Sequence, residues 1–220
     1  MAIAKEPLPP PGWGLESIAS LLEAFPRGHL SEIVGPRSAG GSSLLTALLA
    51  RATATGDLVA LVDGADAFDP AGAAAAGAEL RSLCWVRGSG RLDAACRAAE
   101  LLARCGGFAW VALDLAADLT GPARTPPTFA PATWIRLQRA VRDTPTRLIV
   151  HASRHLAGST AALVLAVERG PARWMGSPRP RRLDGLGSRV RVLRARPPAP
   201  LAGGSGNGGS GTEWVIAWRL

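Results

Sequence analysis

The stretch that decides the fold runs from Phe25 to Leu45 and reads FPRGHLSEIVGPRSAGGSSLL. Its apolar run from Leu30 to Val34 predicts a strand, and leucines at helical spacing predict a helix from about Ser42 to Ala54. A glycine-rich turn joins the two. A strand, a glycine-rich turn and a helix in this order form the setting of a phosphate loop, whose pattern is G-x-x-x-x-G-K-[ST].

The turn lacks the residue on which a working phosphate loop depends. Position 41 is glycine, whereas the motif has a lysine that brings positive charge to the β- and γ-phosphates. The helix N-terminus and Ser42 can still attract an anion weakly. We therefore predict a vestigial loop that binds neither ATP nor magnesium tightly. Its residues are Gly35, Pro36, Arg37, Ser38, Ala39, Gly40, Gly41, Ser42 and Ser43.

Strand and helix patterns alternate on both sides of this loop. Nearly continuous apolar runs predict strands at Leu58–Val62, Leu83–Val86, Phe108–Leu113 and Arg147–Val150. Helices are expected at residues 15–24, 93–104 and 131–141, which gives βαβ units and a mostly parallel central sheet flanked by helices. Three later strands, Ala161–Glu168, Arg189–Leu193 and Glu213–Trp218, have no helices between them. The expected fold class is therefore α/β with antiparallel C-terminal strands.

The chain is expected to form one domain. Residues 1–12 are proline-rich and indicate an extended N-terminal arm, and residues 13–220 form a single core domain. Residues 203–211 read GGSGNGGSG, a composition typical of a flexible linker, whether a natural loop or an engineered replacement.

Composition excludes several classes of protein. Of the 220 residues, 47% are hydrophobic, which is enough to build a buried core. No apolar run approaches the length of a membrane span, and the N-terminus has no secretory pattern. Cys84, Cys96 and Cys105 lack metal-ligand spacing, and His151 and His155 have no supporting ligand, so no metal site is predicted. The expected location is a reducing cytoplasm.

The net charge of +8 is concentrated in one segment. Between positions 173 and 196 lie eight arginines and one acidic residue, Asp184. This segment is a candidate basic surface for nucleic acid or an acidic partner, formed by Arg179, Arg181, Arg182, Arg189, Arg191, Arg194 and Arg196. Two other interpretations remain open: the arginines protect an edge strand from aggregation, or they reflect a GC-rich coding sequence.

Taken in order, the segments of this chain resemble the RecA recombinase family. After residues 25–45 come LVALVDGADAFDP (58–70), GSGRLDAACRAAELLARCGGFAWVALDLA (88–116), RLIVHASR (147–154) and GLGSRVRVLRARPPAP (185–200). The resemblance spans about residues 13–200 and implies a RecA-like core of the P-loop NTPase type. It also implies that Asp114 is the Walker B aspartate.

The departures from RecA affect each catalytic role. Besides Gly41, the position that resembles the water-activating glutamate is Arg91, and the one that resembles the γ-phosphate-sensing glutamine is Ala152. Asp114 remains as a vestigial Walker B residue, with a role as hydrogen-bond acceptor for the phosphate loop. The resemblance places the two DNA-binding loops at residues 120–131, which are poor in charge, and 154–159, which are too few to line a strand. We therefore expect no ATPase activity and weak DNA binding.

Among RecA-like families with degenerate motifs, the chain resembles ImuA. This resemblance implies a non-catalytic accessory protein of SOS-induced mutagenic translesion synthesis in the bacterial cytoplasm. Its implied partners are RecA, the adaptor ImuB and an error-prone replicative-type polymerase. The alternatives are a SulA-like inhibitor of cell division, a residual ATPase, and a weak nucleic-acid binder that uses the arginine-rich segment.

Overall fold

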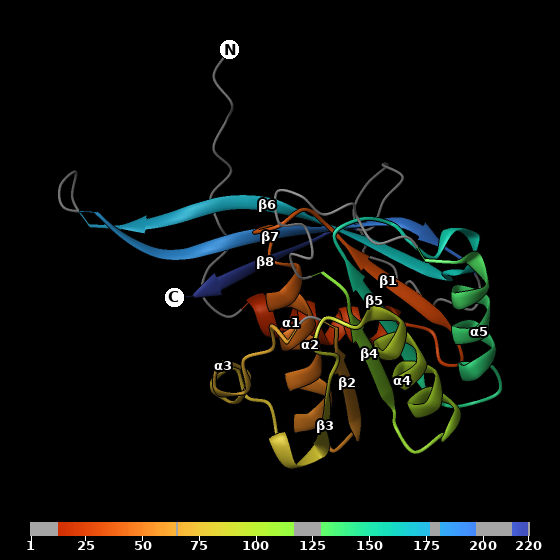
Figure 1. Cartoon of the computed structure of the whole chain (residues 1–220). Coiled ribbons are helices and arrows are strands. Elements are labelled where there is room, and N and C mark those ends of the chain that lie inside the picture. Colours follow the sequence, from red (N-terminus) through yellow and green to blue (C-terminus); the bar gives the residue numbers. More distant parts are fainter. Residues whose placement is uncertain (1–12, 65, 117–128, 177–180, 197–212, 220) are drawn as a thin grey trace.

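The computed structural model describes residues 13–64, 66–116, 129–176, 181–196 and 213–219 (Figure 1). The helices are α1 (Trp13–Ala24), α2 (Gly41–Ala54), α3 (Pro70–Ala75), α4 (Leu92–Arg104) and α5 (Pro131–Val141), with 3-10 turns η1 (Leu80–Ser82) and η2 (Gly158–Thr160). The strands are β1 (Leu30–Val34), β2 (Val59–Asp63), β3 (Leu83–Arg87), β4 (Trp110–Asp114), β5 (Arg147–Ala152), β6 (Leu163–Met175), β7 (Arg182–Ala195) and β8 (Glu213–Arg219).

All eight of these strands join one sheet in the order β3-β2-β4-β5-β1-β6-β7-β8. The pairs from β3 across to β6 are parallel, and β6, β7 and β8 pair antiparallel. The predicted fold class is therefore confirmed. Strand β1 lies between β5 and β6, so the turn that leaves β1 begins near the middle of the sheet.

Helices cover both faces of the parallel part of the sheet (Figure 1). One core cluster lies beneath α1 and α2 and includes the fully buried Phe25, Leu48 and Ile149. The second lies beneath α4 and α5 and includes Leu137 and Leu148. Because successive side chains of a strand point to opposite faces, strands buried on both faces need continuous apolar runs, as the sequence indicated.

The hairpin of β6 and β7 is longer than the sequence predicted. Its strands have 13 and 14 residues and extend as a two-stranded ribbon past the rest of the sheet (Figure 1). Trp174 lies in the outer part of β6 and is exposed. The outer ribbon was missed because Gly170 and Ala172 interrupt the apolar pattern there, and backbone pairing rather than core burial holds this region together.

Closer to the core, the side chains of β7 alternate between a buried and an exposed face. Val190 is buried, while Arg189 and Arg191 are exposed on the opposite face. The pairing register shifts between Val164 and Leu165, opposite Leu193, which is 55% exposed. Leu193 is therefore the extra residue of a β-bulge.

Some expectations fall outside the part of the chain that the structure describes. These are the arm of residues 1–12, the linker of residues 203–211, Arg179 and most of residues 120–131. Within the described ranges, no helix is long and apolar enough to cross a bilayer.

Candidate functional site: the glycine-rich loop after β1

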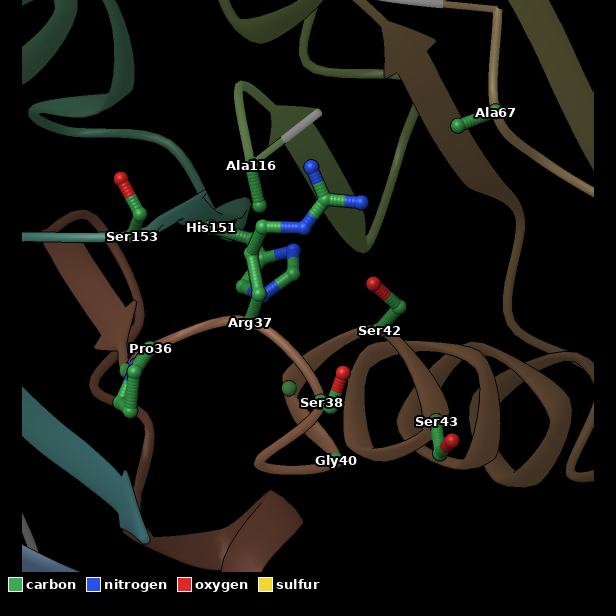
Figure 2. Close-up of a pocket in the computed structure, with 12 residues that line it drawn as sticks. Pro36, Arg37, Ser38, Gly40, Ser42, Ser43, Ala67, Ala116, His151 and Ser153 are labelled. Carbon is green, nitrogen blue, oxygen red and sulfur yellow. The ribbon is translucent and has the colours of Figure 1, made fainter. Parts of the chain in front are cut away.

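The glycine-rich loop, residues 35–43, lies where β1 ends and α2 begins. It forms one wall of a cavity of about 340 Å³, and Ala67, Ala116, His151 and Ser153 line the rest. Figure 2 shows the Arg37 guanidinium reaching into this space and the Ser42 hydroxyl turned toward it, while the Ser43 hydroxyl turns away. The loop therefore has the position and the opening of a phosphate site.

The imidazole of His151 occupies the space beside Gly41. A Cβ added to Gly41 would lie 2.5 Å from His151 Nε2 and 3.4 Å from two ring carbons. His151 is almost fully buried near the end of β5, so its ring has little room to move aside. The Cβ of a lysine at position 41 would therefore collide with this ring.

Asp114 holds the imidazole in place. The two residues are register partners on β4 and β5, and Asp114 Oδ1 lies 3.0 Å from His151 Nδ1. The same carboxylate oxygen accepts the backbone N–H of Ala116 at 2.9 Å. We expected Asp114 to serve the phosphate loop as an acceptor; the contacts of the described residues give it His151 and Ala116 instead.

The loop is braced from outside by β6, β7 and β8. Ser188 Oγ donates to the carbonyl of Ala39 at 2.6 Å, and Trp218 Nε1 donates to Ser188 Oγ at 2.8 Å. An Arg169 N–H donates to the carbonyl of Arg37 at 3.3 Å. Gly40 has φ +98°, and a Cβ there would collide with Ser188 Oγ. The loop conformation is thus fixed by protein contacts.

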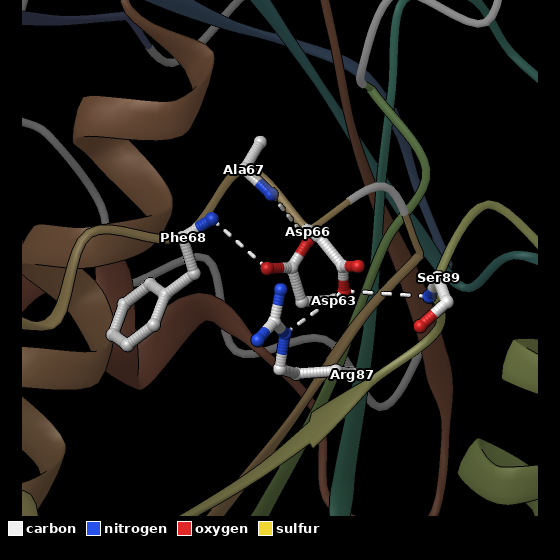
Figure 3. Close-up of polar contacts among 6 residues, drawn as sticks. All are labelled: Asp63, Asp66, Ala67, Phe68, Arg87 and Ser89. Atoms are coloured by element: carbon white, nitrogen blue, oxygen red, sulfur yellow. Dashed lines mark hydrogen bonds and ion pairs between the residues drawn. The ribbon is translucent and has the colours of Figure 1, made fainter.

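A buried carboxylate also shapes the turn after β2. Asp63 accepts the backbone N–H groups of Ala67 and Phe68 at 3.0 and 2.9 Å (Figure 3). Beside it, Asp66 accepts from Arg87 Nε and the Ser89 N–H. Desolvation acts to raise the pKa of Asp66, but the hydrogen bonds from Ser89 and Arg87 and the charge of Arg87 together hold it below its usual value. These contacts fix the segment that carries Ala67 to the cavity.

The short loop after β5 is fixed by Glu32, a fully buried residue in the middle of β1. Glu32 Oε1 accepts the backbone N–H groups of Leu156 and Ala157 at 2.9 and 2.8 Å, and Oε2 pairs with His155 Nδ1. From the other side, Arg194 and Arg196 donate to the carbonyls of Gly158 and Ser159 at 2.5 and 2.7 Å.

The candidate basic surface is partly paired with acids. Arg191 pairs with Glu168, and Arg189 Nε lies 3.9 Å from Glu213. Arg182 lies 4.0 Å from Asp184, which also pairs with Arg173. Arg181 is exposed. Arg181 and Arg182 lie at the start of β7, whereas Arg194 and Arg196 lie at its end beside η2. The arginines therefore form separate groups rather than one patch.

The two other substituted positions lie on different elements. Arg91 is the exposed residue that precedes α4, and Ala152 is the buried last residue of β5. Among the described residues, no group of three potential metal ligands occurs.

Comparisons with known proteins identify the family to which the chain belongs. The model of the RecA N-terminal domain matches residues 12–161. This chain belongs to the RecA N-terminal domain family. The RecA protein of Borrelia hermsii is 36% identical over 120 residues, which are 50% of this chain and 33% of that protein. The RecA protein of Methylococcus capsulatus is 38% identical over 96 residues, or 44% of this chain and 27% of that protein.

A solved structure is similar in fold to most of this RecA-family chain. The RadB recombinase superposes with a TM-score of 0.58 at 16% identity, covering 89% of this chain and 88% of RadB. At this identity the match concerns the fold alone. The matched segment spans about a third of the length of the curated RecA relatives.

Sequence reasoning missed four residues that the structure brings to the loop or its neighbour: His151, Glu32, Ser188 and Trp218. Two signals were present. A glutamate in the middle of the apolar strand LSEIV needs partners for its charge, and a histidine near the end of a strand beside the Walker B strand is close to the loop. Ser188 and Trp218 gave no such signal, because their contacts depend on how β7 and β8 pair.

Proposed function

We propose that this RecA-family chain is a catalytically silent accessory protein of the ImuA type, which acts in mutagenic DNA repair through protein contacts. The observation that carries the catalytic part is the pairing of His151 with Asp114 beside Gly41. The space for the lysine is filled, and the carboxylate that would attend the metal is engaged. Phosphoryl transfer depends on both groups, so the proposal predicts no ATP turnover.

The choice of partners rests on family membership and on the resemblance to ImuA. RecA, ImuB and an error-prone polymerase are the partners it implies, and a SulA-like division inhibitor remains the alternative. The shortened, clamped loop after β5 supports a protein-binding role, because a loop held by Glu32, Arg194 and Arg196 is not available to wrap a single strand of DNA.

The test is co-purification of the full chain with RecA, with and without single-stranded DNA and ATP. Retention only when DNA and ATP are present identifies an accessory that recognises the active filament. Retention by free RecA indicates sequestration or end-capping, and retention by ImuB alone places the chain with the adaptor. The proposal is contradicted if the chain binds none of the three partners, RecA, ImuB and the polymerase. ATP turnover above that of a Ser42→Ala, Asp114→Ala double variant contradicts its catalytic part.

Weak nucleic-acid binding is a second candidate, favoured by the placement of Arg189 and Arg191. Their side chains are about half exposed, 48% and 51%, on the face of β7 opposite the buried Val190. Binding through these residues falls steeply with salt and weakens in the Arg189→Ala, Arg191→Ala variant. Arg97→Ala, which changes an exposed arginine on α4, is the control. Salt-insensitive binding, or equal loss in both variants, contradicts this candidate.

A further inference from the structure

The outer face of α4 and α5 combines exposed apolar and basic side chains. The two helices pack against each other over the same face of the sheet (Figure 1). Leu101 on α4 is 69% exposed, the most of any large apolar side chain in the described part of the chain, and Ile135 on α5 is 47% exposed. Neither side chain belongs to the core that the helices cover, so core packing does not require an apolar residue at either position.

The arginines of the two helices lie beside these apolar side chains in a repeated pattern. Each helix has a series of three exposed residues at intervals of four and three positions, with one apolar residue and two arginines. The two series are Arg97, Leu101, Arg104 on α4 and Ile135, Arg139, Arg142 on α5 and at its end. Residues at this spacing lie on one side of a helix. Each helix therefore presents an apolar side chain flanked by basic ones to the solvent.

The acids of this surface do not balance its arginines. Glu100 lies between the helices and pairs with Arg104 at 2.8 Å and with Arg136 at 3.1 Å. Within the described ranges, the other three arginines form no ion pair: Arg97, Arg139 and Arg142. The nearest other acids in the sequence are Asp93, in the first turn of α4, and Asp143, just after α5. The surface is therefore positively charged and suits a negatively charged partner.

The rest of this chain does not supply the complementary charge. Outside the described ranges, residues 1–12 and 117–128 each contain one acidic and one basic residue, and residues 177–180 and 197–212 contain no acidic residue. A second copy of the chain carries a net charge of +8 itself. The occupant that the charge favours is therefore a different molecule.

The apolar side chains favour a protein over a nucleic acid as that molecule. A nucleic acid is held mainly through its phosphates by basic and polar side chains, and an exposed leucine or isoleucine adds little to such contacts. Protein interfaces combine apolar side chains with arginine, whose N–H groups pair with carboxylates. Leu101 and Ile135 beside unpaired arginines match this second pattern.

We propose that the outer face of α4 and α5 binds an acidic segment of another protein. Apolar side chains of that segment contact Leu101 and Ile135, and its carboxylates pair with Arg97, Arg139 and Arg142. Helix α2, which follows the glycine-rich loop, covers the opposite face of the sheet. The inference therefore goes beyond the proposed function and does not depend on it.

The experiment is a selection of random peptides of fixed length, displayed on phage, for binding to the full chain. Peptides that also bind the Leu101→Ser, Ile135→Ser variant are depleted. We expect the surviving peptides to combine several aspartates or glutamates with apolar residues. In a parallel selection, depletion with Leu58→Ser, which changes an exposed leucine before β2, should remove these same peptides because the surface of α4 and α5 is intact.

Charge variants separate this surface from general attraction of acids to a basic chain. The affinity of a selected peptide, measured by fluorescence anisotropy, should fall as salt is added. It should fall about tenfold or more in the Arg97→Glu, Arg139→Glu variant, because like charges then face each other. Arg51→Glu, which reverses an exposed arginine on α2, should change the affinity far less. Urea unfolding confirms that each variant is folded.

Three peptide results overturn the proposal: no peptide survives depletion, the survivors are not acidic, or the two charge variants bind them equally. Duplex DNA that binds more weakly to the Arg97→Glu, Arg139→Glu variant but equally to the Leu101→Ser, Ile135→Ser variant would assign the face to nucleic acid instead. A dimer that dissociates in the Leu101→Ser, Ile135→Ser variant would assign it to a second copy. The peptide selection contains no RecA, ImuB or polymerase, so its failure is distinguishable from failure of the proposed accessory function.

Discussion

Gly41 and His151 are sterically coupled, because a Cβ on Gly41 would lie 2.5 Å from Nε2 of the buried imidazole. The loss of the lysine and the presence of the histidine are therefore one structural change rather than two. A larger residue at position 41 can be accommodated only if the imidazole of His151 moves, and Asp114 limits that movement by holding Nδ1.

Restoring the lysine alone should fail. Gly41→Lys is expected to leave ATP binding undetectable and to lower stability by about 1–3 kcal/mol, because the new side chain overpacks against the ring. Gly41→Lys with His151→Asn makes space and frees Asp114, so the double variant should bind a fluorescent ATP analogue. The double-mutant cycle measures the coupling. Equal ATP affinity in the single and double variants would contradict it.

The contribution of Ser188 to holding the loop can be measured with two glycines that have a similar backbone conformation. Gly40 and Gly56 have φ of +98° and +91°, but only the Cβ at position 40 meets Ser188 and Trp218; nothing lies within 4 Å at position 56. Alanine at either position costs roughly 1–2 kcal/mol for the left-handed conformation. Gly40→Ala should cost at least about 1 kcal/mol more because it displaces Ser188. Urea unfolding measures the loss of stability in the two variants. Equal losses would contradict a role for Ser188 in bracing the loop.

The parallel sheet was predictable because its strands are buried on both faces. Runs such as VALVD in β2 and WVALD in β4 are apolar enough to identify a strand without knowledge of its neighbours. The ends of β6 and β7 were not predictable. Their outer halves are exposed and hold together by pairing between residues such as Ala172 and Leu186, a property of the pair rather than of either sequence.

The absence of the lysine could be read directly from the sequence, but its consequence could not. Asp114 and His151 are 37 residues apart, and they meet because β4 and β5 pair in a register that places them opposite each other. From the sequence we expected Asp114 to have a partner in the loop, but the strand register places its partner on the neighbouring strand. Site geometry of this kind depends on strand order, which the local pattern does not specify.

The clamp on the short loop after β5 should depend on Glu32. Glu32→Ala removes the acceptor for the N–H groups of Leu156 and Ala157 and leaves them buried, at a cost of about 3–5 kcal/mol. Hydrogen exchange at these two amides should accelerate in a Glu32→Gln variant, which keeps the shape but weakens the acceptor. Glu100→Ala removes an acid with exposed arginine partners and should cost less than about 1 kcal/mol. Unchanged exchange at both amides would rule the clamp out.

The three cysteines should differ in reactivity because only Cys96 is buried. Burial, with a smaller contribution from the charge of Asp93, raises the pKa of Cys96 from 9.0 to about 11. At pH 8 a disulfide reagent should therefore modify Cys84 and Cys105 rapidly and Cys96 only after unfolding.

The raised pKa of Cys96 should also make the stability of the folded chain depend on pH. Between pH 9 and 11 the unfolded chain releases a proton that the folded chain retains, so stability falls as pH rises. Cys96→Ala should flatten that slope in urea unfolding at pH 9 and 10, whereas Cys84→Ala should not; equal slopes in the two variants would show that Cys96 does not carry the effect.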